Sequence, residues 1–158
     1  MILRVGKLML QVVRFHLLMP TNKLSQYGNQ QALEAVFRRT QSPATGNVYL
    51  ALLTATPTDT NLTMAAVTEY GATGYARQIF GPTAATAAEP SVTQNTGILT
   101  FGPFTAGTGA TVTHAAVCDA VSGTAANIIG TVALTASRTP ATGDSLQAAA
   151  GAFTFSSN

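Results

Sequence analysis

His114 and Asp119 are the two residues whose types best suit acid–base catalysis in this chain of 158 residues. They stand five positions apart in an apolar stretch, and side chains an odd number of positions apart on a strand point to opposite faces. A serine nucleophile would need a base and an orienting group, and the motif G-x-S-x-G does not occur. The sequence therefore predicts no catalytic site and no enzymatic activity, with His114 as a half-buried strand residue.

The motifs for metal or cofactor binding are incomplete. The single Cys118 excludes a disulfide scaffold and a thiolate metal site, and without a basic neighbour it is expected to be a small buried residue. Residues 59–63 carry oxygen atoms at alternate positions, as calcium loops do, but Met64 and Tyr70 replace the required glycine and glutamate. Residues 107–112 begin like a phosphate loop but lack its third glycine and its lysine. We expect a side-chain-stabilised turn at residues 59–63, and no metal or cofactor.

Composition limits the function further. Charged residues make up 9% of the chain, against about 25% in a typical soluble domain, whereas the hydrophobic share of 46% is ordinary. Disordered chains show the opposite combination, low hydrophobicity and high charge. The net charge of +2, without basic residues interleaved with aromatic ones in the second part of the chain, argues against a nucleic-acid-binding protein. The length corresponds to one domain.

The charges divide the chain into two regions. The first 39 residues carry six cations and one acid, a net charge of +5. The remaining 119 residues carry two cations and five acids, a net charge of −3. One end is therefore suited to an acidic or apolar partner, and the other to water.

Residues 1–18 are apolar apart from Arg4, Lys7, Gln11, Arg14 and His16. The first four of these follow helical spacing, so a helix here would carry one narrow polar stripe. The segment fits poorly to a secretory signal, which has an uninterrupted apolar core, or to a membrane span, which has a longer uncharged run. Two interpretations stay open: residues 1–21 are an arm that docks on a partner, or translation starts at Met19.

Residues 22–40 are predicted to form one amphipathic helix. Thr21 or Asn22 can cap its start, because either side chain can accept a hydrogen bond from a free backbone N–H. Apolar residues recur at helical spacing from Leu24 onward. Leu33 and Phe37 are expected to face another surface, and Arg38 and Arg39 close the helix, where cations interact favourably with its dipole.

Residues 41–158 are predicted to form an antiparallel β-sandwich. Short runs of β-branched and apolar residues alternate with turns rich in Gly, Pro and Asn, a pattern typical of all-β sandwiches and barrels. The expected strands are residues 47–54, 75–80, 98–101, 112–119, 127–134, 145–149 and 152–155, with loops at 55–74, which contains a short helix at 62–67, and at 83–91. The fold class is therefore mainly β, an Ig-like or jelly-roll-like sandwich with one N-terminal amphipathic helix.

Arg77 and Arg138 are the two cations of the β region. A lone arginine in a strand is usually a surface residue whose stem packs flat, and we expect this for both. The alternative is that the arginine pairs with an acid across a sheet or a subunit contact. Arg77 is also included, with the helix residues, among the candidate docking or assembly residues, which are Leu33, Phe37, Arg38, Arg39 and Arg77.

Two motifs of the β region carry a resemblance. They are Gly74-Tyr-Ala-Arg-Gln78, and Gly143-Asp-Ser-Leu146 followed by Gly151-Ala-Phe153. In this order, and with the preceding helix and strands, the chain resembles a family of small structural proteins of tailed bacteriophages, described as tail-fibre-like or head-decoration proteins. The resemblance covers about residues 22–156 and implies a β-sandwich that assembles on a virion without catalysing a reaction. It brings no catalytic residues with it.

We therefore expect a capsid decoration (cement) protein or a tail-surface component on the phage particle. Its partners would be major capsid or tail proteins, and copies of itself in a symmetric assembly, for which we expect a trimer. We expect no nucleic acid and no membrane among its partners. The small polar surface suits close packing, because fewer charges must be desolvated.

Two alternatives remain. A receptor- or glycan-binding fibre module would use the loops at residues 55–74 and 102–111, since binding sites often lie on loops, although the chain has no tryptophan for a sugar platform. A hydrolase would need two carboxylates from distant loops, and Glu69, Asp119 and Asp144 are the acids to test.

Overall fold

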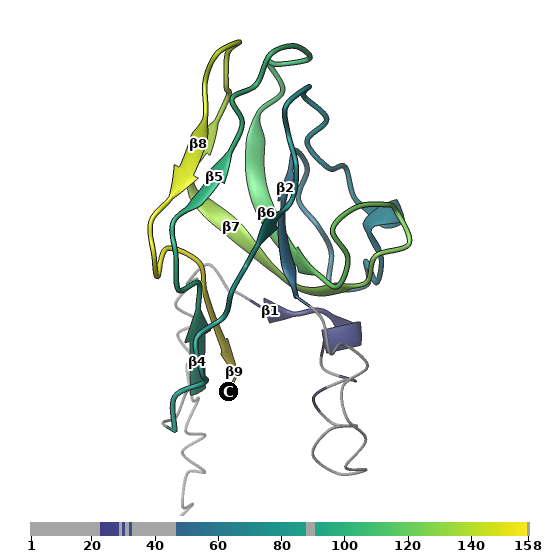
Figure 1. Ribbon diagram of the computed structural model, residues 1–158. Coiled ribbons are helices and arrows are strands. Elements are labelled where there is room, and N and C mark those ends of the chain that lie inside the picture. Colours follow the sequence, from purple (N-terminus) through teal and green to yellow (C-terminus); the bar gives the residue numbers. More distant parts are fainter. Residues whose placement is uncertain (1–22, 29, 31, 33–46, 88–90, 158) are drawn as a thin grey trace, which may run out of the picture.

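The computed structural model describes residues 23–28, 30, 32, 47–87 and 91–157, which form a mainly β structure (Figure 1). Every strand pair is antiparallel. The elements are β1 (Lys23–Leu24), β2 (Tyr49–Leu53), the 3-10 helix η1 (Met64–Ala66), β3 (Gln78–Ile79), β4 (Ser91–Gln94), β5 (Leu99–Phe101), β6 (Val112–Cys118), β7 (Ile128–Arg138), β8 (Leu146–Ala148) and β9 (Thr154–Ser157). The expected fold class is confirmed.

The largest sheet has five strands in the order β1-β7-β6-β2-β3. Its central strands β2 and β6 are rich in buried apolar residues, because both faces of the sheet are covered. Leu50 pairs with Val117 and Leu52 with Ala115, and residues two positions apart on a strand share a face. These four side chains therefore point into the same core.

The β5–β8 pair lies against the face of the sheet that carries these four side chains. The β4–β9 pair lies below the β5–β8 pair in the view of Figure 1, next to the C-terminus. Phe101 of β5 and Phe155 of β9 are buried in the core between the layers. The rings of Phe80 and Phe155 meet edge to face, with 5.6 Å between their centroids, an arrangement that aromatic pairs favour. The second layer thus consists of two separate strand pairs.

The opposite face of the large sheet is covered by the segment around η1. The Met64 N–H donates to the Ala126 carbonyl (2.8 Å), and the Ile128 N–H donates to the Leu62 carbonyl (2.9 Å). These bonds hold the η1 segment to the start of β7, over a second buried cluster. Its members are Ala51, Leu53, Met64, Ala116, Cys118, Ala126 and Ile128.

The chain joins the sheet before the helix begins. Leu24, which was expected in the helix, belongs to β1 and pairs with Gly130. Ser25 caps the residues that follow, because its hydroxyl accepts a hydrogen bond from the Gly28 N–H (3.1 Å) and donates one to a carbonyl of β7. A Cβ at Gly28 would lie 2.2 Å from the Ile129 carbonyl oxygen, so only glycine allows this close approach to β7.

Residues 26–28, 30 and 32 have helical backbone. The four docking candidates of the predicted helix, Leu33, Phe37, Arg38 and Arg39, lie outside the described residues, and so do residues 1–22 with the expected caps. No helix in the described part of the chain is long and apolar enough to cross a membrane.

Most of the predicted strands are present. Strands β2, β5, β6 and β8 lie within the predicted ranges, β9 overlaps its range, and η1 lies inside the short helix expected at residues 62–67. The strand predicted over residues 75–80 is reduced to β3, because Tyr75 and Arg77 are drawn into the side-chain cluster described below. Strand β7 continues beyond residue 134 to Arg138, and β4, whose short sequence is mostly polar, was not predicted.

Candidate functional site

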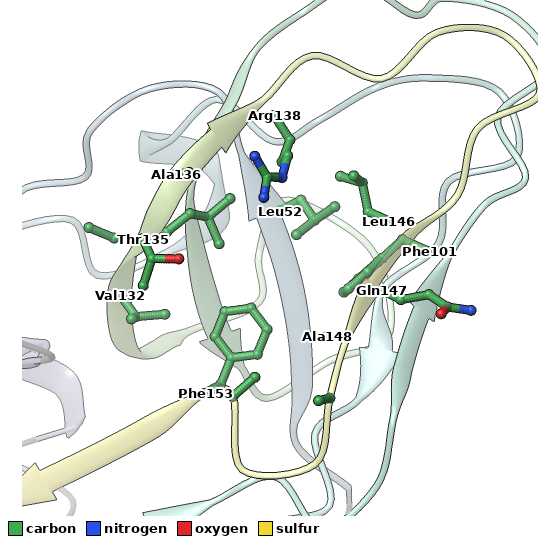
Figure 2. Close-up of a pocket in the computed structure, with 14 residues that line it drawn as sticks. Leu52, Phe101, Val132, Thr135, Ala136, Arg138, Leu146, Gln147, Ala148 and Phe153 are labelled. Carbon is green, nitrogen blue, oxygen red and sulfur yellow. The ribbon is translucent and has the colours of Figure 1, made fainter.

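A groove lies between β7 of the large sheet and β8 of the second layer (Figure 2). Its volume is about 250 Å³. The floor comes from the core residues Leu52, Phe101, Val132 and Phe153, and the walls include small residues of both strands. The groove therefore has an apolar floor and a narrow, mostly uncharged rim.

The pairing of β7 with β6 is interrupted beside this groove. Val112 pairs with Arg138 and His114 with Ala133, so five steps along β7 correspond to two steps along β6. Residues 134–137 consequently bulge out of the ladder, and β1 covers only the opposite end of β7. Strand β8 pairs only with β5 among the described strands. Free strand edges expose unpaired N–H and C=O groups, which makes them places where other molecules bind.

Two polar side chains of β7 stand at the rim of the groove. The guanidinium of Arg138 turns toward its interior, with Thr135 on the same strand (Figure 2). Gln147 belongs to the other wall, but its amide points away from the groove (Figure 2). Arg138 and Thr135 are exposed, and neither has a hydrogen-bond or ion-pair partner in the described part of the chain. Their full hydrogen-bonding capacity is therefore open to a ligand.

Arg77 is placed differently from expectation. Its side chain is 3% exposed and forms an ion pair with Glu69, whose side chain is 26% exposed. Its Nη1 and Nη2 also donate to the carbonyls of Ala120 and Gly123, both at 2.9 Å. The surface interpretation of Arg77 is wrong, and the alternative, pairing with an acid, is confirmed.

Tyr75 extends this cluster into the large sheet. Its hydroxyl donates to Glu69 Oε1 (2.8 Å) and accepts a hydrogen bond from the Leu52 N–H (2.9 Å). Burial, and then the negative charge of Glu69, raise the pKa of the Tyr75 hydroxyl. The hydrogen bond that Arg77 donates to Glu69 is the main cause that raises the pKa of Arg77. The cluster locks the segment before β3 in place; a docking role of Arg77 stays a prediction.

The His114 and Asp119 side chains have separate partners. His114 is half-buried, as expected, its Nδ1 lies 2.9 Å from the Thr113 hydroxyl, and burial lowers its pKa. The Asp119 carboxylate accepts hydrogen bonds from the backbone N–H and the side-chain amide of Asn127, both at 2.7 Å. Asp119 therefore closes the loop between β6 and β7.

The Cys118 thiol is fully buried, with its Sγ 3.5 Å from the carbonyl oxygens of Tyr49 and Ala120. Burial is the main cause that raises the pKa of this thiol. The prediction of a small buried residue is confirmed.

A turn lies at residues 58–61, partly before the expected range of 59–63: the Thr58 N–H donates to Asn61 Oδ1 (2.7 Å), and the Asn61 N–H donates to the Thr58 carbonyl (3.0 Å). Within the described ranges, no group of three or more His, Cys, Asp or Glu side chains is placed to hold a metal ion. Asp144, the third acid considered for hydrolysis, accepts a hydrogen bond from the Ala141 N–H (2.8 Å) and so stabilises a turn.

The two loops proposed for receptor binding are joined where residues 70–74 meet residues 103–107. The Thr73 N–H donates to the Ala106 carbonyl (2.8 Å), and the Thr105 N–H donates to the Thr73 carbonyl (2.9 Å). The rings of Tyr70 and Phe104 also meet edge to face, with 5.2 Å between their centroids. The earlier part of the loop at 55–74 runs to η1 on the other face of the large sheet, so only its last residues lie beside the loop at 102–111.

Sequence reasoning missed the groove. Its floor and walls come from four separate strands and the turn before β9, so no local motif marks it. The sequence offered one signal for the groove, since Arg138 is one of only two cations in the β region. The structure shows that the other cation, Arg77, is paired with Glu69.

Comparison with curated proteins finds no match. Comparison with protein families gives one: residues 23–156 match the family described as podophage GP4 fiber I protein gp80. The match runs from β1 into β9 and so includes the ion-pair cluster and the groove. The chain therefore belongs to the podophage GP4 fiber I protein gp80 family and is a structural component of the phage particle.

Proposed function

We propose that the protein is a non-enzymatic structural unit of a podophage tail fibre, which acts through contacts with copies of itself and with neighbouring tail proteins. The observation that carries this proposal is the family match over residues 23–156. The matched family is one of fibre proteins, and it gives no support to the capsid decoration function that the sequence alone favoured.

The use of the charged groups supports a structural function. Glu69 neutralises Arg77, Asp119 binds Asn127, and Asp144 closes a turn. Each of these side chains stabilises the fold of the chain. Among the residues that the structure describes, none of the three acids shares a cleft with a second acid. A body built in this way is suited to rigidity and to repeated copies, which a fibre needs.

The proposed partners are other copies of this chain and tail proteins. Homo-oligomers are mostly symmetric, and a trimer is the assembly to test first. Light scattering of the purified full chain, after size-exclusion chromatography, measures this directly: a mass of three chains is expected, and a monomer at micromolar concentration would contradict a self-assembling unit.

A second function, recognition of a receptor, is favoured by one observation. The groove between β7 and β8 holds two polar side chains, Arg138 and Thr135, without described partners above an apolar floor. Soluble protein that competes with phage for adsorption to host cells would support this function.

Location on the particle tests the main proposal. A short epitope inserted in the phage gene between Thr124 and Ala125 would lie at an exposed position of the loop between β6 and β7. Gold-labelled antibody is expected to mark the tail of intact particles. A label spread over the head would overturn the fibre proposal in favour of decoration.

A further inference from the structure

We propose that the groove between β7 and β8 binds an acidic sugar residue of a surface glycan, with the sugar carboxylate held by Arg138 (Figure 2). The inference deepens the receptor-recognition side of the proposed function and rests on it for its biological setting. The choice of an acidic sugar as the ligand is argued only from the residues of the groove.

The charge of Arg138 indicates an anionic ligand. Of the two arginines in the β region, Arg77 is buried and neutralised by Glu69, whereas Arg138 is exposed, has no described partner and turns into the groove. A guanidinium presents its N–H donors in a planar fork that matches both oxygens of a carboxylate. An uncharged ligand would leave this donor set largely unused.

The floor and rim fit a sugar ring. Small-ligand sites are mostly apolar, with a few polar groups that fix orientation. Here the core side chains Leu52 and Phe153 form the floor, suited to the apolar C–H face of a ring, while Thr135 offers a hydroxyl at the rim. Phe153 is 6% exposed, so it supports the ligand from below and does not form a stacking wall.

The shape of the walls favours a compact ligand over a peptide. A peptide strand adds to a straight free edge, but β7 bulges at residues 134–137 and β8 has 3 residues, Leu146–Ala148. Neither wall offers an edge of the length that strand addition needs. A compact sugar ring does not need such an edge.

Titration of the isotope-labelled full chain by nuclear magnetic resonance tests the proposal with two matched probes. Methyl glucuronide carries the carboxylate, and methyl glucoside is its neutral counterpart. The glucuronide is expected to shift the amide signals of residues 133–138 and 146–149. The glucoside is expected to bind about 10-fold to 100-fold more weakly, the loss expected when a hydrogen bond to a charged group is removed.

Two variants of β7 sharpen the test. Arg138→Gln keeps a polar side chain without the charge and is expected to weaken glucuronide binding at least about 10-fold while leaving glucoside binding unchanged. Ser137→Ala is the matched control, because Ser137 is exposed on the same strand and does not line the groove. Both substitutions are at exposed positions, so the thermal unfolding midpoint should not move, and its measurement excludes misfolding.

Three outcomes would overturn the proposal. They are equal binding of the two sugars, glucuronide binding that survives Arg138→Gln, and signal shifts produced by a short glutamate-containing peptide but by neither sugar. The last result would identify a peptide site. Failure of the fibre proposal is distinguishable, because the epitope label reports location on the particle whether or not a sugar binds.

Discussion

Glu69 holds the guanidinium of Arg77 through two parallel hydrogen bonds, from Nε to Oε1 at 2.8 Å and from Nη2 to Oε2 at 2.7 Å. The same guanidinium binds carbonyls of the loop between β6 and β7. One buried cation thus joins two segments that are far apart in the sequence. Removing one partner of a buried ion pair strongly destabilises a protein, because the remaining charge stays buried without a partner.

Replacement of Glu69 by alanine is expected to lower the free energy of unfolding by about 3–5 kcal/mol, because the buried Arg77 charge loses its partner. Urea unfolding followed by circular dichroism measures the change. Asp144→Ala is the control, since this exposed acid accepts a backbone hydrogen bond and should cost about 1 kcal/mol. The double variant Glu69→Leu with Arg77→Met should recover much of the loss; equal losses for Glu69→Ala and Asp144→Ala would contradict the proposed role.

Gly74 and Gly143 form a matched pair for substitution. Both have left-handed backbone, with φ of +91° and +93°, but a Cβ at Gly74 would lie 2.2 Å from the Pro103 carbonyl oxygen, whereas a Cβ at Gly143 meets nothing within 4 Å. Gly143→Ala is therefore expected to cost only the conformational term, about 1–2 kcal/mol. Gly74→Ala should lower the free energy of unfolding clearly more, or prevent folding. Thermal unfolding measures both variants, and equal midpoints would show that Gly74 does not lie this close to Pro103.

Asn95 is a fully buried amide whose polar atoms are all used. Its Nδ2 donates to the carbonyls of Gly97 (2.7 Å) and Ala149 (2.8 Å), and its Oδ1 accepts from the Phe153 N–H (2.9 Å). Asn95→Ala leaves buried backbone groups without hydrogen-bond partners and is expected to lower the free energy of unfolding by about 2–3 kcal/mol. Asn95→Asp should cost at least as much, because a carboxylate faces two carbonyl oxygens.

The control for Asn95 is its neighbour Gln94, an exposed amide, for which alanine substitution should cost less than about 0.5 kcal/mol. Denaturant midpoints of the three variants separate a buried anchor from an ordinary surface amide. A midpoint for Asn95→Ala that equals that of Gln94→Ala would show that the buried hydrogen bonds contribute little.

The central strands β2 and β6 were predictable because their sequences are rich in apolar residues and bounded by turn residues. Strand β4 was not, since its four residues Ser91–Gln94 resemble the preceding loop and owe their conformation to pairing with β9. Leu24 was assigned to the helix because its spacing fits, but pairing with β7 overrides that local preference. In each case a contact distant in sequence decided the structure.

The candidate site was much harder to predict. The motifs around Arg77 and Gly143 are visible in the sequence, but they do not predict that Arg77 is buried. Its partner Glu69 and the carbonyls that it binds belong to separate segments of the chain. The groove depends on the β7 bulge, which exists only relative to β6. Such a mismatch in pairing has no signature within a single strand.

Cys118 is expected to be unreactive in the folded protein. The thiol is fully buried and its pKa is raised by burial, and the thiolate is the reactive form. In 5,5′-dithiobis(2-nitrobenzoate) at pH 8, the native protein should react very slowly, and the urea-unfolded protein should react at once. Rapid labelling of the native protein would show that the β2–β6 region opens easily.

His114 should make stability depend on pH. Burial lowers its pKa below the usual value of 6.5, so below pH 6.5 the unfolded chain takes up a proton more readily than the folded one. The free energy of unfolding is therefore expected to be highest above this pH and to fall as the pH drops toward 5. Urea unfolding at pH 7.5, 6.5 and 5.5 measures this loss. His114→Asn removes the titrating group and should lose less stability over the same pH interval. All other ionisable groups contribute equally in the two proteins, so the difference reports on His114. If the two proteins lose stability equally, the half-buried imidazole does not control the response.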